Sequence, residues 1–98
     1  MIRGTTPTNI FNVDADLTTA SAVYITYEQD GVTAFEKTLE DILVEANKLT
    51  VTLTQEETLS LKEKDVRIQI RAKYPDGSAI ASNIIITTAG AILKKGVI

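Results

Sequence analysis

Residues 65–78 read DVRIQIRAKYPDGS, and they contain the strongest structural signal in this chain. Apolar residues alternate strictly with charged or polar ones from Val66 to Tyr74, so a β-strand here has one apolar face and one water-facing side. The next residues, Pro75–Ser78, suit a tight turn, because proline presets one φ angle and glycine supplies a positive one. A second β-rich run, Ala79–Thr88, follows. The stretch therefore predicts a long antiparallel hairpin.

The same alternation recurs upstream at short intervals. Asp30-Gly31 is a two-residue hairpin signal of the type I′ kind, because both positions accept positive φ angles. The pattern predicts strands at residues 9–13, 22–29, 32–38 and 49–54.

Residues 39–46 are ambiguous, because their apolar positions fit a helical stripe as well as a strand. We favour a short strand, since Asn47-Lys48 then forms a turn into the next one. Thr54-Gln55-Glu56-Glu57 is a capping-box pattern, in which the threonine hydroxyl and the glutamate carboxylate satisfy two orphan backbone amides. It predicts one short helical turn before the long strand.

These elements amount to about seven strands and one helical turn in 98 residues, enough for a single domain spanning residues 1–98. Isoleucine, valine and threonine are abundant, while only five residues are aromatic, a composition that favours strands with an aliphatic core. We expect an all-β fold: an immunoglobulin-like, two-sheet antiparallel β-sandwich. A small barrel is the competing architecture.

Composition excludes several classes of activity. The formal net charge of −3 disfavours nucleic-acid binding, which requires clustered lysine and arginine. The chain contains no histidine and no cysteine, which removes Ser-His-Asp and Cys-His hydrolysis and cysteine-held iron–sulfur clusters. The two glycine-rich phosphate-binding motifs, GxGxxG and GxxxxGK followed by serine or threonine, do not occur. We expect no enzyme activity, no cofactor and no small-molecule substrate.

Targeting signals are also missing from the pattern. No apolar run approaches the roughly 18 residues that a membrane-spanning helix needs, and residues 1–7 lack the hydrophobic region of a signal peptide. We expect no membrane contact, and a product made in the cytoplasm that reaches its destination by assembly.

Asp14-Ala15-Asp16-Leu17-Thr18 matches the DxDxT string of phosphotransferases that use an aspartyl nucleophile. That fold needs a doubly wound sheet with several crossover helices, and this chain has no room for them. A weak cation site at Asp14 and Asp16 is also disfavoured, because calcium takes six to eight oxygen ligands. We interpret the segment as a polar loop and assign no metal site.

The three tyrosines raise the possibility of a carbohydrate-binding platform. The spacing of Tyr24 and Tyr27 puts them on opposite faces of one strand, so they do not stack together. Tyr74 ends the long strand and suits an anchor for the turn. Core or corner packing is the interpretation that we favour.

Two surfaces are candidate docking sites. Arg67 and Arg71 lie with Lys73 on the water-facing side of the long strand, where they could bind an acidic partner or form a solvated face. We expect Glu28 or Glu36 on a neighbouring strand to neutralise them in part. The second candidate is the C-terminal stretch, which either docks onto a partner or packs on its own domain; its apolar residues are Ile92, Leu93, Val97 and Ile98.

Five segments, taken in order, resemble a known family. They are RGTTPT at 3–8, LTQEET at 53–58, IQIR at 68–71, DGSAIASN at 76–83 and GAILKKGVI at 90–98. This order resembles small phage and prophage structural proteins of Gram-positive hosts, and it is similar to the amino-terminal module of upper baseplate proteins. The resemblance extends over nearly the whole chain.

The resemblance implies a non-enzymatic β-sandwich of the virion that takes part in tail or baseplate assembly. Its partners would be other phage structural proteins or further copies of itself. Upper baseplate proteins have a longer carboxy-terminal part that binds receptor-binding proteins, and that role is not transferred to these 98 residues. The alternative from a different class is a carbohydrate-binding or cell-wall-attachment β-sandwich module.

Overall fold

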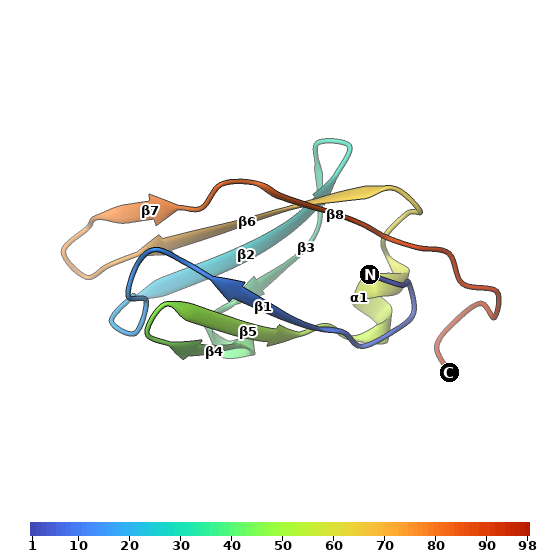
Figure 1. Ribbon diagram of the computed structural model, residues 1–98, viewed down its shortest axis with the longest axis horizontal. Helices are drawn as coiled ribbons and strands as arrows, with labels where there is room; N and C mark the ends of the chain where they lie inside the picture. The colour runs from blue at the N-terminus through green and yellow to red at the C-terminus, as the bar shows by residue number, and fades with distance from the viewer.

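The computed structural model describes all 98 residues and contains two antiparallel sheets (Figure 1). The smaller sheet has three strands, in the order β1 (Thr8–Asn12), β5 (Lys48–Thr52) and β4 (Ile42–Glu45). The larger sheet has five, in the order β3 (Val32–Thr38), β2 (Ala22–Gln29) and β6 (Asp65–Lys73), with β7 (Ala79–Ala81) and β8 (Ile85–Thr88) both pairing with β6.

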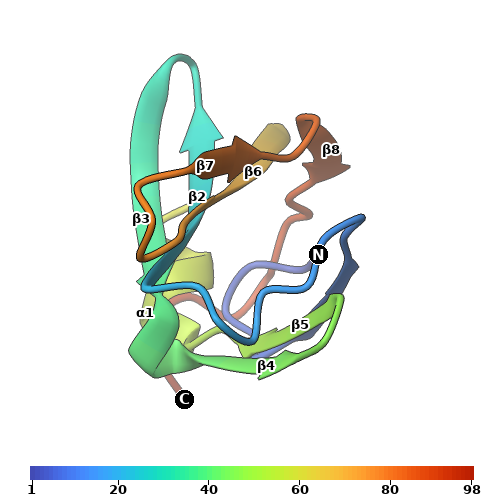
Figure 2. The same cartoon turned by 90° about the vertical axis from the view of Figure 1, so that its left-hand side faces the viewer.

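The two sheets face each other across an aliphatic core, an arrangement compatible with a β-sandwich (Figure 2). Alternation along the strands supplies that core, because every second side chain points inward. The buried residues at the centre are Val23, Ile25 and Tyr27 of β2, Leu49 and Val51 of β5, and Val66, Ile68, Ile70 and Ala72 of β6. The apolar and water-facing sides predicted for the long strand are thus confirmed.

The local signals around the first hairpin are confirmed as well. Strands β2 and β3 have the predicted limits, and Asp30 and Gly31 between them both have positive φ angles, of 55° and 76°, as a type I′ turn requires. The signals that predicted these limits come from residues adjacent in sequence.

The capping box also forms as predicted. Thr54 Oγ1 accepts a hydrogen bond from Glu57 N at 3.1 Å, and Glu57 Oε1 accepts one from Thr54 N at 2.8 Å. These two hydrogen bonds cap the N-terminus of the short helix α1 (Gln55–Leu59), which connects β5 of one sheet to β6 of the other. Neither α1 nor the 3₁₀ turn η1 (Leu39–Asp41) is long and apolar enough to cross a membrane.

The ambiguous segment contains both structures that its pattern allowed. Residues 39–41 form the 3₁₀ turn, and the favoured short strand begins at Ile42. The turn after it falls one residue earlier than predicted, on Ala46 and Asn47, and Ala46 has a positive φ angle of 34°.

The predicted run over residues 79–88 is interrupted, so the chain has eight strands where we expected about seven. Ser82 causes the interruption by bonding to β6 with its side chain as well as its backbone. Its hydroxyl accepts from Ile70 N at 3.0 Å, and its amide donates to Ile70 O at 2.8 Å. A side-chain hydroxyl that competes for ladder amides breaks a strand locally, and the result is two short strands, β7 and β8.

Core packing gives a first test. Leu53 is fully buried after β5. The substitution Leu53→Ala should lower the free energy of unfolding by about 2–5 kcal/mol, because the lost methyl groups leave a cavity. The matched control is Leu43→Ala on β4, whose side chain is exposed, with an expected change within about 0.5 kcal/mol. Urea unfolding of both variants measures the difference. Equal losses for the two leucines would contradict the assignment of the core.

Candidate docking sites

The basic side chains on the outer face of β6 are only partly neutralised; we call Arg67, Arg71 and Lys73 the row. Arg67 lies opposite Glu28 of β2 and pairs with it at 3.4 Å, which confirms one of the two acids proposed as partners. Glu36 is not a partner of the row; its carboxylate accepts from the Thr26 hydroxyl at 2.8 Å instead. Arg71 and Lys73 form no ion pair, so two positive charges remain available on this face.

Apolar side chains flank these charges on the same outer face. Tyr24 of β2 lies opposite Arg71, and Ile86 of β8 lies opposite Arg67. Both are exposed, as is the nearby Ile84. We call Tyr24, Arg71, Ile84 and Ile86 the outer patch. Tyrosine and arginine are enriched at the energetic centres of protein interfaces, so this patch can bind both an apolar group and a carboxylate.

Sequence reasoning missed the two isoleucines of the outer patch. Residues 84–86 are three consecutive isoleucines, so no alternation says which of them faces inward. Their sides depend on the register with β6 and on the interruption at Ser82. The run of three isoleucines was itself the signal available in the sequence.

The four apolar residues proposed near the C-terminus do not lie together. Ile92 is partly buried and lies close over Gly4 beside Leu59, so it packs on its own domain. Leu93, Val97 and Ile98 project into solvent, with Leu93 99% and Ile98 84% exposed. The backbone of Ile98 is nevertheless held, because its N–H donates to Gln55 Oε1 at 2.9 Å and its oxygen accepts from Gln55 Nε2 at 3.2 Å.

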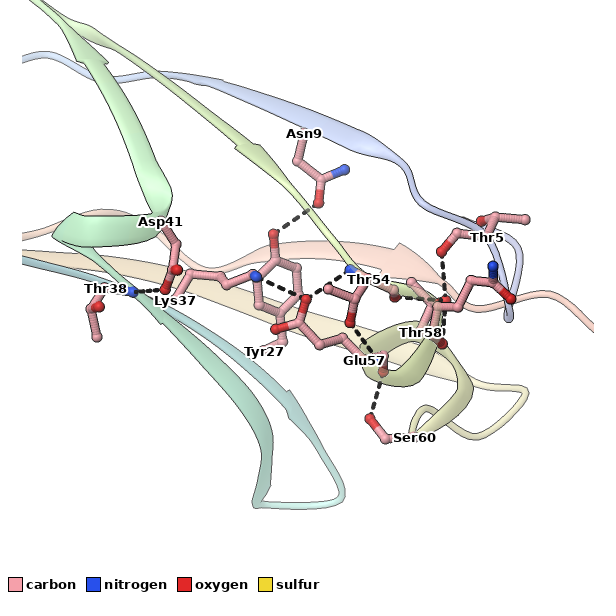
Figure 3. Close-up of polar contacts among 11 residues, drawn as sticks. Thr5, Asn9, Tyr27, Lys37, Thr38, Asp41, Thr54, Glu57, Thr58 and Ser60 are labelled. Carbon is pink, nitrogen blue, oxygen red and sulfur yellow. Dashed lines mark hydrogen bonds and ion pairs between the residues drawn. The ribbon is translucent and has the colours of Figure 1, made fainter. Parts of the chain in front are cut away.

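A polar cluster lies where α1 meets the two sheets, and it was not predicted (Figure 3). Lys37 Nζ of β3 contacts Glu57 Oε1 of α1 at 2.8 Å, although Lys37 is only 7% exposed. The fully buried Tyr27 of β2 donates its hydroxyl to Asn9 Oδ1 of β1 at 2.8 Å. The available signal was an inward-facing lysine in the alternation of β3.

Electrostatics in this cluster favour a neutral phenol. Burial, and secondly the negative charge of Glu57, raise the pKa of Tyr27 well above its usual value of 10.0. The contacts connect β1, β2, β3 and α1, and none of the four main surface hollows is lined by these residues. We interpret the cluster as a structural connection between the sheets and the helix.

The DxDxT segment forms a loop between β1 and β2, as the polar-loop interpretation predicted. Leu17 is buried and anchors it. Asp16 Oδ1 accepts from both the hydroxyl and the amide of Thr18, at 2.6 and 2.9 Å, and these bonds lower the pKa of Asp16. The loop is therefore ordered by its own side chains, and no group of three or more acidic residues gathers in the structure.

The tyrosines lie as their spacing predicted. Tyr24 is exposed and Tyr27 buried on opposite faces of β2. Tyr74 holds the DxDxT loop against the end of β6, because its hydroxyl donates to Asp16 O at 2.7 Å. The three rings therefore do not share one surface.

A hollow of about 450 Å³ lies along one flank of the molecule, between the DxDxT loop and the edge formed by β7 and β8. We call it the flank groove. Its apolar lining includes Val13, Ile70, Ile80 and Ile85, and Asp14 lies among the lining residues.

No protein-family model, no curated protein and no solved structure matches this chain.

The polar cluster generates a test of its charge pair. Glu57→Gln keeps an oxygen that can accept from Thr54 N but removes the charge opposite the buried Lys37. We expect a loss of about 1–3 kcal/mol in the free energy of unfolding, because a buried ammonium then lacks its counter-charge. Glu56→Gln, at the exposed neighbouring position, is the matched control and should change little in chemical denaturation. Equal effects would show that the Lys37–Glu57 contact contributes no stability.

Tyr27 generates a test at high pH. Its raised pKa keeps the phenol protonated in the folded chain, so the unfolded chain loses this proton first. The corresponding stability is complete below about pH 10 and is lost as the pH rises beyond it. Between about pH 8 and about pH 11, the midpoint of urea unfolding should fall further for the parent chain than for Tyr27→Phe. Parallel curves would rule out a buried, titrating phenol.

Proposed function

We propose that this chain is a structural protein of a phage or prophage virion that acts in tail or baseplate assembly by docking onto other proteins, without catalysis. The five-segment resemblance supports the phage assignment. The outer patch supports docking: its arginine has no intramolecular ion-pair partner and lies among exposed apolar side chains. This combination on a regular sheet face is the observation on which the docking role depends.

We also propose that the sandwich is of the immunoglobulin-like type. The order β3-β2-β6-β8 corresponds to strands C′, C, F and G of such domains, and β1-β5-β4 corresponds to B, E and D. Helix α1 then lies between strands E and F. The disulfide and tryptophan of antibody domains are absent from this chain, so the kinship is one of architecture.

A cell-wall-attachment module has less support. Carbohydrate platforms use clustered exposed aromatic rings, and Tyr24 is the one exposed aromatic side chain among the five. A single ring offers a sugar little stacking area.

The assembly function is tested on particles. We expect mass spectrometry to find this chain in density-gradient-purified particles from its source strain, and Arg71→Glu combined with Ile86→Asp to deplete it from them. Both side chains are exposed, so the double variant should fold normally by circular dichroism. Val32→Asp, exposed at the β2–β3 hairpin outside the outer patch, is the control and should still be incorporated. Particles that lack the chain, with tails and baseplates unaffected by its deletion, would overturn the proposal.

A further inference from the structure

The flank groove exists because the core is left uncovered on one side. Ile80 pairs with Ala72 and Ile85 with Ile68, so both side chains point inward between the sheets. They are nevertheless 39% exposed each, since the smaller sheet ends at β1 and no strand crosses the gap. Because these inward-facing isoleucines remain in contact with water, covering them with further apolar side chains is favourable.

Two free strand edges border the groove. Neither β1 nor the β7–β8 edge has a neighbouring strand on its outer side, and such edges present unpaired N–H and C=O groups. The apolar lining and the free backbone groups therefore suit an extended apolar segment, as in strand addition.

The chain itself contains a segment of this chemistry. Residues 91–98 read AILKKGVI, with Leu93 and Val97 exposed. Lys94 and Lys95 between them form no ion pair. Asp14 in the lining of the groove has no ion-pair partner either, so the groove and the segment are complementary in both charge and hydrophobicity.

Strand β7 and the DxDxT loop, which border the groove, lie at one end of a molecule 47 Å long, and the C-terminal residues lie at the other (Figure 1). Contact between two different surfaces of identical chains is heterologous, and it propagates into a ring or a filament.

We propose that the flank groove binds residues 93–97 of a second copy of this chain, so that copies associate head to tail. Leu93 enters beside Ile80 and Ile85, and Lys94 or Lys95 pairs with Asp14. The proposal rests on the assembly function above and names one partner for it, the chain itself.

A charge exchange tests this contact. Sedimentation velocity should show the full chain associating as its concentration rises. Asp14→Lys and the double variant Lys94→Asp/Lys95→Asp should each weaken association by about tenfold or more, because like charges then meet. A mixture of these two variants should associate again, since every groove then finds a segment of opposite charge. Leu93→Asp should weaken association similarly, and Val32→Asp, outside both surfaces, should not.

Three results would overturn the head-to-tail contact. They are a chain that stays monomeric at all concentrations, association that Asp14→Lys and Leu93→Asp leave unchanged, and methyl NMR contacts between Leu93 and Ile80 within a monomer. The head-to-tail contact and the assembly function can fail independently. A monomeric chain that is found in particles contradicts only the head-to-tail contact, while a self-associating chain that is absent from particles contradicts only the virion role.

Discussion

Burial of one face of β6 is the constraint on which the rest of the structure depends. This strand is paired on both sides, with β2 along one edge and with β7 and β8 along the other. Its inward face, from Val66 to Ala72, is buried against the smaller sheet. A slip of one residue in its register would turn Arg67 and Arg71 into the core, and burying two unpaired guanidinium groups there would be strongly unfavourable. The alternation therefore sets the register and, with it, the outward position of the arginines.

The interruption at Ser82 follows from the same strand and shapes the surface. Because Ser82 bonds to Ile70 with its hydroxyl, the chain leaves the ladder between β7 and β8 and rejoins it at Ile85. The edge of the larger sheet is thus two short strands with a bend. Short or bent edges are less able to pair with an arbitrary strand. A groove at such a bend favours a partner of particular shape and charge, which fits selective docking better than non-specific aggregation.

Most of what the sequence predicted rests on local signals, the pairing of Arg67 with Glu28 being an exception; most of what it missed depended on contacts between distant residues. Strands β2 and β3, their Asp30-Gly31 turn and the Thr54–Glu57 cap are each signalled by neighbours within a few positions. The pairing of Lys37 with Glu57 joins residues far apart in sequence, and the sides taken by Ile84 and Ile86 depend on β6. The C-terminal candidates show both limits: apolarity marked them correctly as unusual, but only the fold separates the packed Ile92 from the exposed Leu93.

The distribution of chemistry over the surface is compatible with the assembly role that we propose for this chain. Some of its titratable groups are used for structure: Glu57 caps a helix and holds Lys37, and Asp16 orders its own loop. Other side chains have no intramolecular partner: Arg71 on the outer face, Asp14 in the groove, and Leu93 and Lys95 near the C-terminus. The outer patch lies on a sheet face, while β7 and the DxDxT loop, which border the groove, lie at the other end of the long axis from residues 91–98 (Figure 1). A subunit with separate lateral and axial surfaces can join its own copies along one direction and still bind a different protein along another.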